Sequence, residues 1–173
     1  STTVRDISQQ KENEKRIHEL NHNLEQQVRE RTAELAGLNT LLSTVMSATY
    51  EFTIIATDLN GTIQLFNKGA ERMLGYSEAE VVGKVTPVII HLPEEVEHYS
   101  QQLSAEHHER INGFDAFVYH ARRGLPEQRE WTYVRKDGSR FPVRLVVTTM
   151  HNADGELTGY LGISMDITQQ RQA

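Results

Sequence analysis

The composition of the chain changes abruptly near residue 50. Residues 1–49 contain no aromatic residue, no proline and a single glycine, Gly37. All 12 aromatic residues, all 4 prolines and the other 10 glycines follow. A segment without aromatic bulk or turn residues suits a helix, but it cannot build a compact core. The sequence therefore predicts a long helix followed by one small domain.

Apolar residues of the first segment recur at the spacing of a coiled-coil seam. Counted through Arg31, which shares the track, the intervals are 3, 4, 4, 3, 4, 3, 4 and 3 residues. This pattern is typical of heptads with one stutter, and so narrow a stripe is best buried against a partner helix. We expect a paired helix over residues 9–47, with a solvated single helix as the alternative; the seam alone allows parallel and antiparallel pairing. The seam residues are Ile17, Leu20, Leu24, Val28, Leu35, Leu38, Leu42 and Val45.

The second segment has the pattern of a small α+β domain. Alternating apolar runs between Asn-Gly and Asp-Gly turns predict five short strands of one antiparallel sheet. Capping signals predict short helices over one face: Asn67 before a helix ended by Gly75, Ser77 with Glu80, and Pro93 at the start of a helix to about His108. Residues 114–124 fit either periodicity. The expected strands are residues 52–57, 62–66, 129–135, 140–150 and 157–167.

Charge and composition narrow the function. The net charge of −6 argues against broad binding to nucleic acids or to an anionic membrane. No window approaches the roughly 20 apolar residues of a membrane span. The absence of cysteine excludes disulfides, thiolate nucleophiles and cysteine-ligated metals. No motif for a nucleophile or a phosphate loop occurs, so we expect no catalytic residues in this segment.

One motif resembles a zinc site. His18-Glu19-Leu20-Asn21-His22 matches the H-E-x-x-H pattern, in which two histidines on one helix face bind zinc beside a glutamate base. Leu20 belongs to the seam, however, and an exposed rod offers neither a third ligand nor a pocket. We therefore expect no metal site, and keep a zinc enzyme as the least favoured hypothesis.

Four stretches in the same order resemble a PAS domain. They are ATDLNGTIQLFNKGAERMLGYSEAEVVGK (56–84), LPEEVE (92–97), RKDGSRFPVRLVVT (135–148) and GYLGISMDIT (159–168). The resemblance implies a five-stranded antiparallel sheet of spatial order 2-1-5-4-3, with helices over one face that enclose a pocket. The stretch LEQQVRERTAEL (24–35) resembles linkers of sensor histidine kinases and diguanylate cyclases.

A near-repeat indicates a multidomain parent protein. The sequence near the start, Asp6-Ile7-Ser8-Gln9-Gln10, is similar to the sequence near the end, Asp166-Ile167-Thr168-Gln169-Gln170. In PAS proteins a D-I-T motif ends the last strand and leads into the next helix. We therefore expect residues 1–8 to be the exit of a preceding PAS-like domain, 9–47 a coiled-coil signalling helix, 48–168 the PAS domain and 169–173 the start of an exit linker.

The resemblance also suggests where a ligand and a signal would act. No cofactor is expected; the alternatives are haem bound through His98, or a flavin stacked on Trp131 and Tyr133 with amide contacts from Asn67. Asp166 and Thr168 are expected to pass a signal from the last strand into the exit helix. The candidates for the pocket, which could equally be plain core, are Ile54, Ile63, Leu65, Asn67, Met73, His98, Trp131, Tyr133, Phe141, Val143 and Leu145.

The expected function is that of a sensory and dimerisation module. It would perceive or relay a signal, with a small molecule as possible ligand, and pass it through flanking helices to a kinase or cyclase domain of the parent. The alternative is a structural dimeric spacer with a filled core. We expect a homodimer joined by the coil and contacts with adjacent signalling domains. We also expect a cytoplasmic location for this segment, whether or not the parent is tethered to a membrane.

Overall fold

The computed structural model describes residues 2–125 and 127–172. Ser1 and Ala173, the outer ends of the expected exit segment and linker, lie outside the described residues, as does Pro126. The chain divides into two compact units, Ser1–Thr44 and Val45–Ala173. Each is described by itself below.

The described residues of the first unit all lie in one helix, α1 (Thr2–Ala48). It starts seven residues earlier than the seam predicts, because residues 2–8 contain no proline or glycine that would stop it. At about 1.5 Å per residue its 47 residues span roughly 70 Å. Asp6 and Ile7 lie inside this helix, whereas Asp166 ends a strand.

The seam residues of α1 are all exposed. The exposed fraction of the eight predicted side chains runs from 50% at Val45 to 63% at Leu35, and Val4, Ile7 and Leu41 are exposed as well. The seam is thus a continuous apolar stripe on the helix, and its pairing with a second copy stays a prediction.

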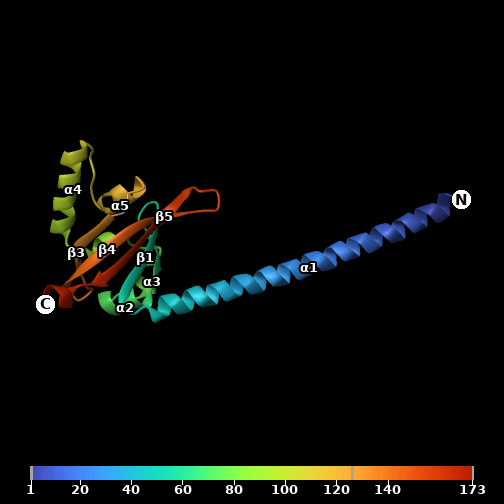
Figure 1. The fold of residues 1–173 in the computed structure, drawn as a ribbon, viewed down its shortest axis with the longest axis horizontal. Helices are drawn as coiled ribbons and strands as arrows, with labels where there is room; N and C mark the ends of the chain where they lie inside the picture. The colour runs from blue at the N-terminus through green and yellow to red at the C-terminus, as the bar shows by residue number, and fades with distance from the viewer. Residues whose placement is uncertain (1, 126, 173) are drawn as a thin grey trace. The chain divides into compact units, whose positions relative to one another are not determined.

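The second unit is built on one antiparallel sheet of order β2-β1-β5-β4-β3, which confirms the predicted topology (Figure 1). All five predicted strands form, with ends that differ from the prediction by two residues at most. They are β1 (Phe52–Asp58), β2 (Ile63–Phe66), β3 (Glu127–Val134), β4 (Arg140–His151) and β5 (Leu157–Asp166).

Short helices fill the connections, most of them where capping signals predict. Asn67 caps the first, which ends at Gly75 in the left-handed conformation, and Pro93 opens the longest. The ambiguous segment after Gly113 is a helix. In order the elements are α2 (Lys68–Leu74), α3 (Glu78–Val81), the 3-10 helix η1 (Pro87–Ile90), α4 (Pro93–His107), α5 (Phe114–Arg122) and α6 (Thr168–Gln172).

The core lies between the helices and one face of the sheet. On β4 the predicted alternation holds, since Phe141, Val143, Leu145 and Val147 are all buried. On β5 the more apolar alternating residues, Leu161, Ile163 and Met165, lie on the face of the sheet away from the core, where Ile163 is 39% exposed. The core side of β5 instead carries Tyr160, Gly162 and Ser164, which pair with core-facing positions of β1 and β4.

Candidate functional site

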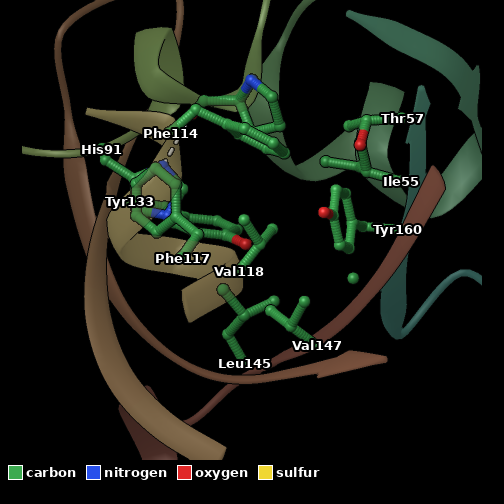
Figure 2. A pocket seen from close by; sticks show the side chains of 12 residues that line it. Ile55, Thr57, His91, Phe114, Phe117, Val118, Tyr133, Leu145, Val147 and Tyr160 are labelled. Carbon is green, nitrogen blue, oxygen red and sulfur yellow. Dashed lines mark hydrogen bonds between the residues drawn. The ribbon is translucent and has the colours of Figure 1, made fainter. Parts of the chain in front are cut away.

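A small cavity lies inside the second unit, between the sheet and the helices. Its volume is about 40 Å³. Strands β1, β3, β4 and β5 supply one wall, and η1, the residue after it and α5 supply the other (Figure 2). The lining is almost wholly apolar or aromatic. It consists of Ile55, Thr57, Pro87, His91, Phe114, Phe117, Val118, Tyr133, Leu145, Val147, Tyr160 and Gly162.

His91 is the most unusual residue of this lining. Its side chain is only 3% exposed, and its ring packs among those of Phe117, Trp131 and Tyr133, with centroids 4.2, 5.3 and 4.9 Å away. Burial lowers the pKa of His91 to about 4, against a smaller opposing effect of its hydrogen bond to Pro87. The imidazole is therefore neutral at physiological pH.

The tautomer of His91 follows from its one hydrogen bond. Nδ1 lies 2.6 Å from the carbonyl oxygen of Pro87, which can only accept, so Nδ1 carries the proton. In a neutral ring Nε2 is then an acceptor. Within residues 2–125 and 127–172 no group donates to Nε2, although the atom is buried. A buried acceptor without a donor is energetically costly.

Two phenols of the lining are held in place by other polar groups. The hydroxyl of Tyr133 meets those of Thr53 and Ser164, which are themselves hydrogen-bonded to each other across β1 and β5. Burial raises the pKa of Tyr133 to about 12, so this hydroxyl stays neutral. Tyr160 accepts a hydrogen bond of 2.8 Å from Nε of Arg122. Figure 2 draws the Tyr160 hydroxyl on the cavity side of its ring.

The structure brings two of the predicted pocket residues, Tyr133 and Leu145, to the cavity. The remaining apolar candidates do not line it; they are buried or half-buried elsewhere in the second unit. His98, the candidate haem ligand, is exposed on α4. The candidates placed away from the cavity are Ile54, Ile63, Leu65, Met73, Trp131, Phe141 and Val143.

Asn67 has a structural role instead of a place in the cavity. Its Oδ1 accepts hydrogen bonds from the backbone N–H groups of Ile54 and Ala70, each 2.9 Å long. Its Nδ2 donates to the carbonyl oxygens of Thr49 and Phe52, both at 3.2 Å. One amide thereby joins the segment before β1, β1 itself and the first turn of α2.

Neither a haem nor a flavin fits the cavity as it stands. Pockets for ligands of ordinary drug size have volumes of roughly 300–1,000 Å³, and this cavity has about 40 Å³. The covalent flavin chemistry that the resemblance implies for some relatives needs a cysteine, which this chain lacks. His91, the one histidine that lines the cavity, packs against the rings of Phe117, Trp131 and Tyr133.

The H-E-x-x-H motif of α1 gathers no further ligands. Across the described parts of the chain, no group of three or more histidine or carboxylate side chains comes close enough to hold a metal ion, including around His18 and His22. A search of the same residues also finds no helix with the length and apolar character needed to cross a bilayer.

The junction after β5 brings Asp166 and Thr168 together, and their expected role in passing a signal stays a prediction. Oδ1 of Asp166 accepts hydrogen bonds from the backbone N–H and the hydroxyl of Thr168, at 2.9 and 2.5 Å. Ile167 is 1% exposed, and its N–H donates to the carbonyl oxygen of Pro142 on β4 at 3.0 Å.

A further contact of this junction was not predicted. Arg171 of α6 donates to Glu130 of β3 at 2.7 Å. This contact, helped by Arg144, lowers the pKa of Glu130 against an opposing effect of burial. The short helix α6 is therefore fixed to the two strands, β3 and β4, whose other face lines the cavity.

Sequence reasoning missed most of the cavity lining, although two signals were present. Phe114, Phe117 and Val118 are spaced three and four residues apart, so a helix over 114–124 would have placed them on one face. His91 follows Ile89 and Ile90 in an apolar run directly before a helix start, where an exposed histidine is not expected.

Comparison with known proteins gives a consistent result. A family model described as a PAS domain matches residues 51–169. Two-component system protein A of Emericella nidulans is 27% identical over 140 residues, which are 80% of this chain and 18% of that protein. Sensor protein FixL of Bradyrhizobium diazoefficiens is 28% identical over 137 residues, 78% of this chain and 23% of FixL. The chain thus spans less than a quarter of these relatives.

Solved structures agree on the fold. The PAS domain of a protein from Colwellia psychrerythraea superposes with a TM-score of 0.61 at 22% identity, over 76% of this chain and 98% of that one. The PAS domain of an HTR-like protein from Haloarcula marismortui gives 0.57 at 26% identity, over 80% and 99%.

Proposed function

Residues 51–169 of this chain belong to the PAS domain family, and we propose that the chain is a sensory and dimerisation module that relays a signal to an output domain of a larger protein. PAS domains are sensory modules, and the relatives named above include a two-component system protein and the sensor protein FixL. By analogy with them the output is a histidine kinase, with a diguanylate cyclase as the alternative. The segment itself performs no catalysis in this proposal.

The observation that carries the dimer is the seam of α1. In a single helix, the eight apolar side chains of the seam would face water along most of the 47 residues of α1, since each is at least half exposed. Isolated helices gain little from such a stripe, whereas pairing removes it from water. A second copy of this chain offers the same stripe in the same register. A parallel pair would hold two sensory domains together at the same end.

Two neighbouring leucines offer a matched test of pairing. Leu42 lies in the seam and Leu41 beside it, and their exposed fractions are 56% and 59%. Leu42→Asp should turn a dimer into a monomer at micromolar concentration in sedimentation equilibrium, because it places a carboxylate at the pair interface. Leu41→Asp should weaken the dimer much less. Equal effects of the two variants, or a monomeric wild-type chain, would refute the proposed coil.

The proposed relay runs from the cavity through the sheet to α6. A change at the cavity acts on Tyr133 of β3 and on Leu145 of β4. The same strands hold α6 through the Glu130–Arg171 contact and through the bond from Ile167 to Pro142. A shift of either strand thus changes the direction in which the chain leaves the domain, which is the two-state element that a relay needs.

Two glycines test the relay. Gly162 lines the cavity, and a Cβ there would lie 3.3 Å from Cδ1 of Leu145, whereas a Cβ at Gly37 would meet nothing within 4 Å. In amide NMR spectra, Gly162→Ala should shift the signals of Thr168 and Arg171, and Gly37→Ala should not. If the cavity variant leaves both signals in place, the domain is a dimeric spacer and the relay is wrong.

The proposal includes no resident haem or flavin. It is supported by the small volume of the cavity, by the exposed position of His98 and by the absence of cysteine from the sequence. The ultraviolet–visible spectrum of the freshly purified protein tests it, because a Soret band or a flavin band would overturn it.

A further inference from the structure

We propose that the cavity binds one small apolar molecule of about two non-hydrogen atoms, the size of ethane or of a diatomic gas. This inference rests on the proposed sensory function and names the chemical class of ligand for the same domain.

The first argument is a glycine in the middle strand of the sheet. Gly162 of β5 faces the core, between its pairing partners Ile55 of β1 and Val147 of β4. A glycine weakens the interior of a strand. Where one occurs, it often marks a bulge, a tight bend, the close approach of another backbone, or the close approach of a ligand.

The structure excludes the first three of these reasons at Gly162. The register of β5 with both neighbouring strands is continuous there, so the strand has no bulge, and β5 runs unbroken from Leu157 to Asp166. A Cβ at Gly162 would lie nearest to Cδ1 of Leu145, at 3.3 Å, and to the carbonyl oxygen of Ile55, at 3.7 Å. Both atoms belong to the paired strands β4 and β1, so no third segment fills the room that the missing side chain leaves in the cavity.

The second argument is that the polar side chains of the lining already have protein partners. Oγ1 of Thr57 donates to the carbonyl oxygen of Asp58 at 3.0 Å. The hydroxyl of Tyr133 meets those of Thr53 and Ser164. Neither side chain needs a polar occupant.

His91 and Tyr160 complete the polar part of the lining. Nδ1 of His91 donates to the carbonyl oxygen of Pro87, and Nε2 is itself buried, so it offers no surface to an occupant. The hydroxyl oxygen of Tyr160 accepts from Arg122, which leaves one phenolic proton. A buried water needs two to four polar partners, so this single proton does not hold one. The lining therefore favours an apolar occupant over water.

The third argument is the charge and the volume of the cavity. Among the described residues that line it, none carries a formal charge at neutral pH, because His91 is held neutral by its burial. An ion would lose its hydration there without a counter-charge. An engineered apolar cavity of about 150 Å³ stays dry and takes up benzene. In proportion, a volume of about 40 Å³ takes roughly two non-hydrogen atoms.

Ethane and methanol test the proposal with the whole chain, because the two molecules are isosteric and only methanol carries a hydroxyl. The measurement is the carbon-13 methyl NMR spectrum, titrated with pressurised ethane or with methanol at the same dissolved concentrations. Helium at equal pressure is the control. The ceiling on affinity per atom sets the dissociation constant at about 6 mM or weaker, so the titration extends into the tens of millimolar.

Ethane should shift the methyl signals of Val118 and Leu145, which line the cavity from α5 and β4, and the shifts should saturate. Methanol should bind at least about fivefold more weakly, because its hydroxyl would be buried without a full set of partners.

Two glycine variants assign the response to the cavity. Gly162→Ala places a methyl group in the cavity and should abolish the ethane response of Val118 and Leu145. Gly37→Ala is the matched control, since a Cβ there meets nothing within 4 Å, and it should leave the response unchanged. The titration of the wild-type chain does not depend on whether Gly162→Ala folds.

The outcomes separate this inference from the proposed function. Methanol that binds as tightly as ethane, or ethane shifts no larger than those under helium, would overturn the apolar site. Neither result bears on dimerisation by the coil, which the leucine variants measure. Conversely, saturable binding of ethane without any response of the amide signals of Thr168 or Arg171 would keep the site and refute the relay.

Discussion

The buried imidazole of His91 should make the stability of the domain depend on pH in a predictable way. In the unfolded chain its pKa is close to the ordinary value of 6.5, and in the folded chain burial lowers this to about 4. Between these values the unfolded state binds more protons, so stability is complete above the unfolded value and falls as the pH drops from 6.5 towards 4. The rings around His91 supply no charge that would compensate, because Tyr133 stays neutral with a pKa of about 12.

The magnitude follows from the two pKa values. At pH 7.5 both states are essentially unprotonated at this site, and the contribution is close to zero. At pH 5 the unfolded residue is almost fully protonated and the folded one only about a tenth, which corresponds to a loss of about 2 kcal/mol in the free energy of unfolding. That is a substantial part of the roughly 5–15 kcal/mol that stabilises a typical domain.

The measurement is urea denaturation at pH 7.5 and pH 5, at one protein concentration, followed by the fluorescence of the buried Trp131. For each variant, the loss is the decrease in the free energy of unfolding from pH 7.5 to pH 5. Comparing this loss between variants cancels the contributions of all other titrating groups. In His91→Phe this loss should be about 2 kcal/mol smaller than in the wild-type chain. In His98→Phe, a matched change at an exposed histidine on α4, it should be unchanged. If His91→Phe and the wild-type chain lose the same free energy, the neutral buried state of His91 is wrong.

Four other substitutions probe the framework of the chain. Asn67→Ala should lower the free energy of unfolding by about 2–4 kcal/mol in urea denaturation, because two backbone N–H groups lose their acceptor; a loss below 1 kcal/mol would contradict its bridging role. Gly69→Ala should lower the free energy of unfolding by about 3 kcal/mol in the same assay, since the new Cβ would lie 2.1 Å from the carbonyl oxygen of Phe52. Gly37→Ala, where a Cβ meets nothing within 4 Å, should stabilise α1 by about 1 kcal/mol in thermal melts followed by circular dichroism. Asp166→Ala should speed amide hydrogen exchange in α6 about fivefold by removing a contact worth about 1 kcal/mol; an unchanged rate would show that Asp166 merely ends β5.

The fold was predictable because local and long-range signals agree in this chain. The alternation of Phe141, Val143 and Leu145 fixes one face of β4, and turn residues limit the strand lengths. Capping residues such as Asn67 and Pro93 define where helices begin. The segment 114–124 could not be assigned because its apolar residues satisfy both periodicities, and contacts with the sheet decide in favour of a helix.

The site was harder to predict, because a cavity is what remains after packing and has no sequence pattern of its own. Most of the apolar candidates occupy the core or the opposite face of the sheet, and their hydrophobicity alone cannot tell them from Leu145, which lines the cavity. On β5 the less apolar alternation faces inward, since Gly162 leaves the space that a larger residue would fill. Gly162 and His91 lie about 70 residues apart in the sequence and line the same cavity, so only the fold shows that they belong to one site.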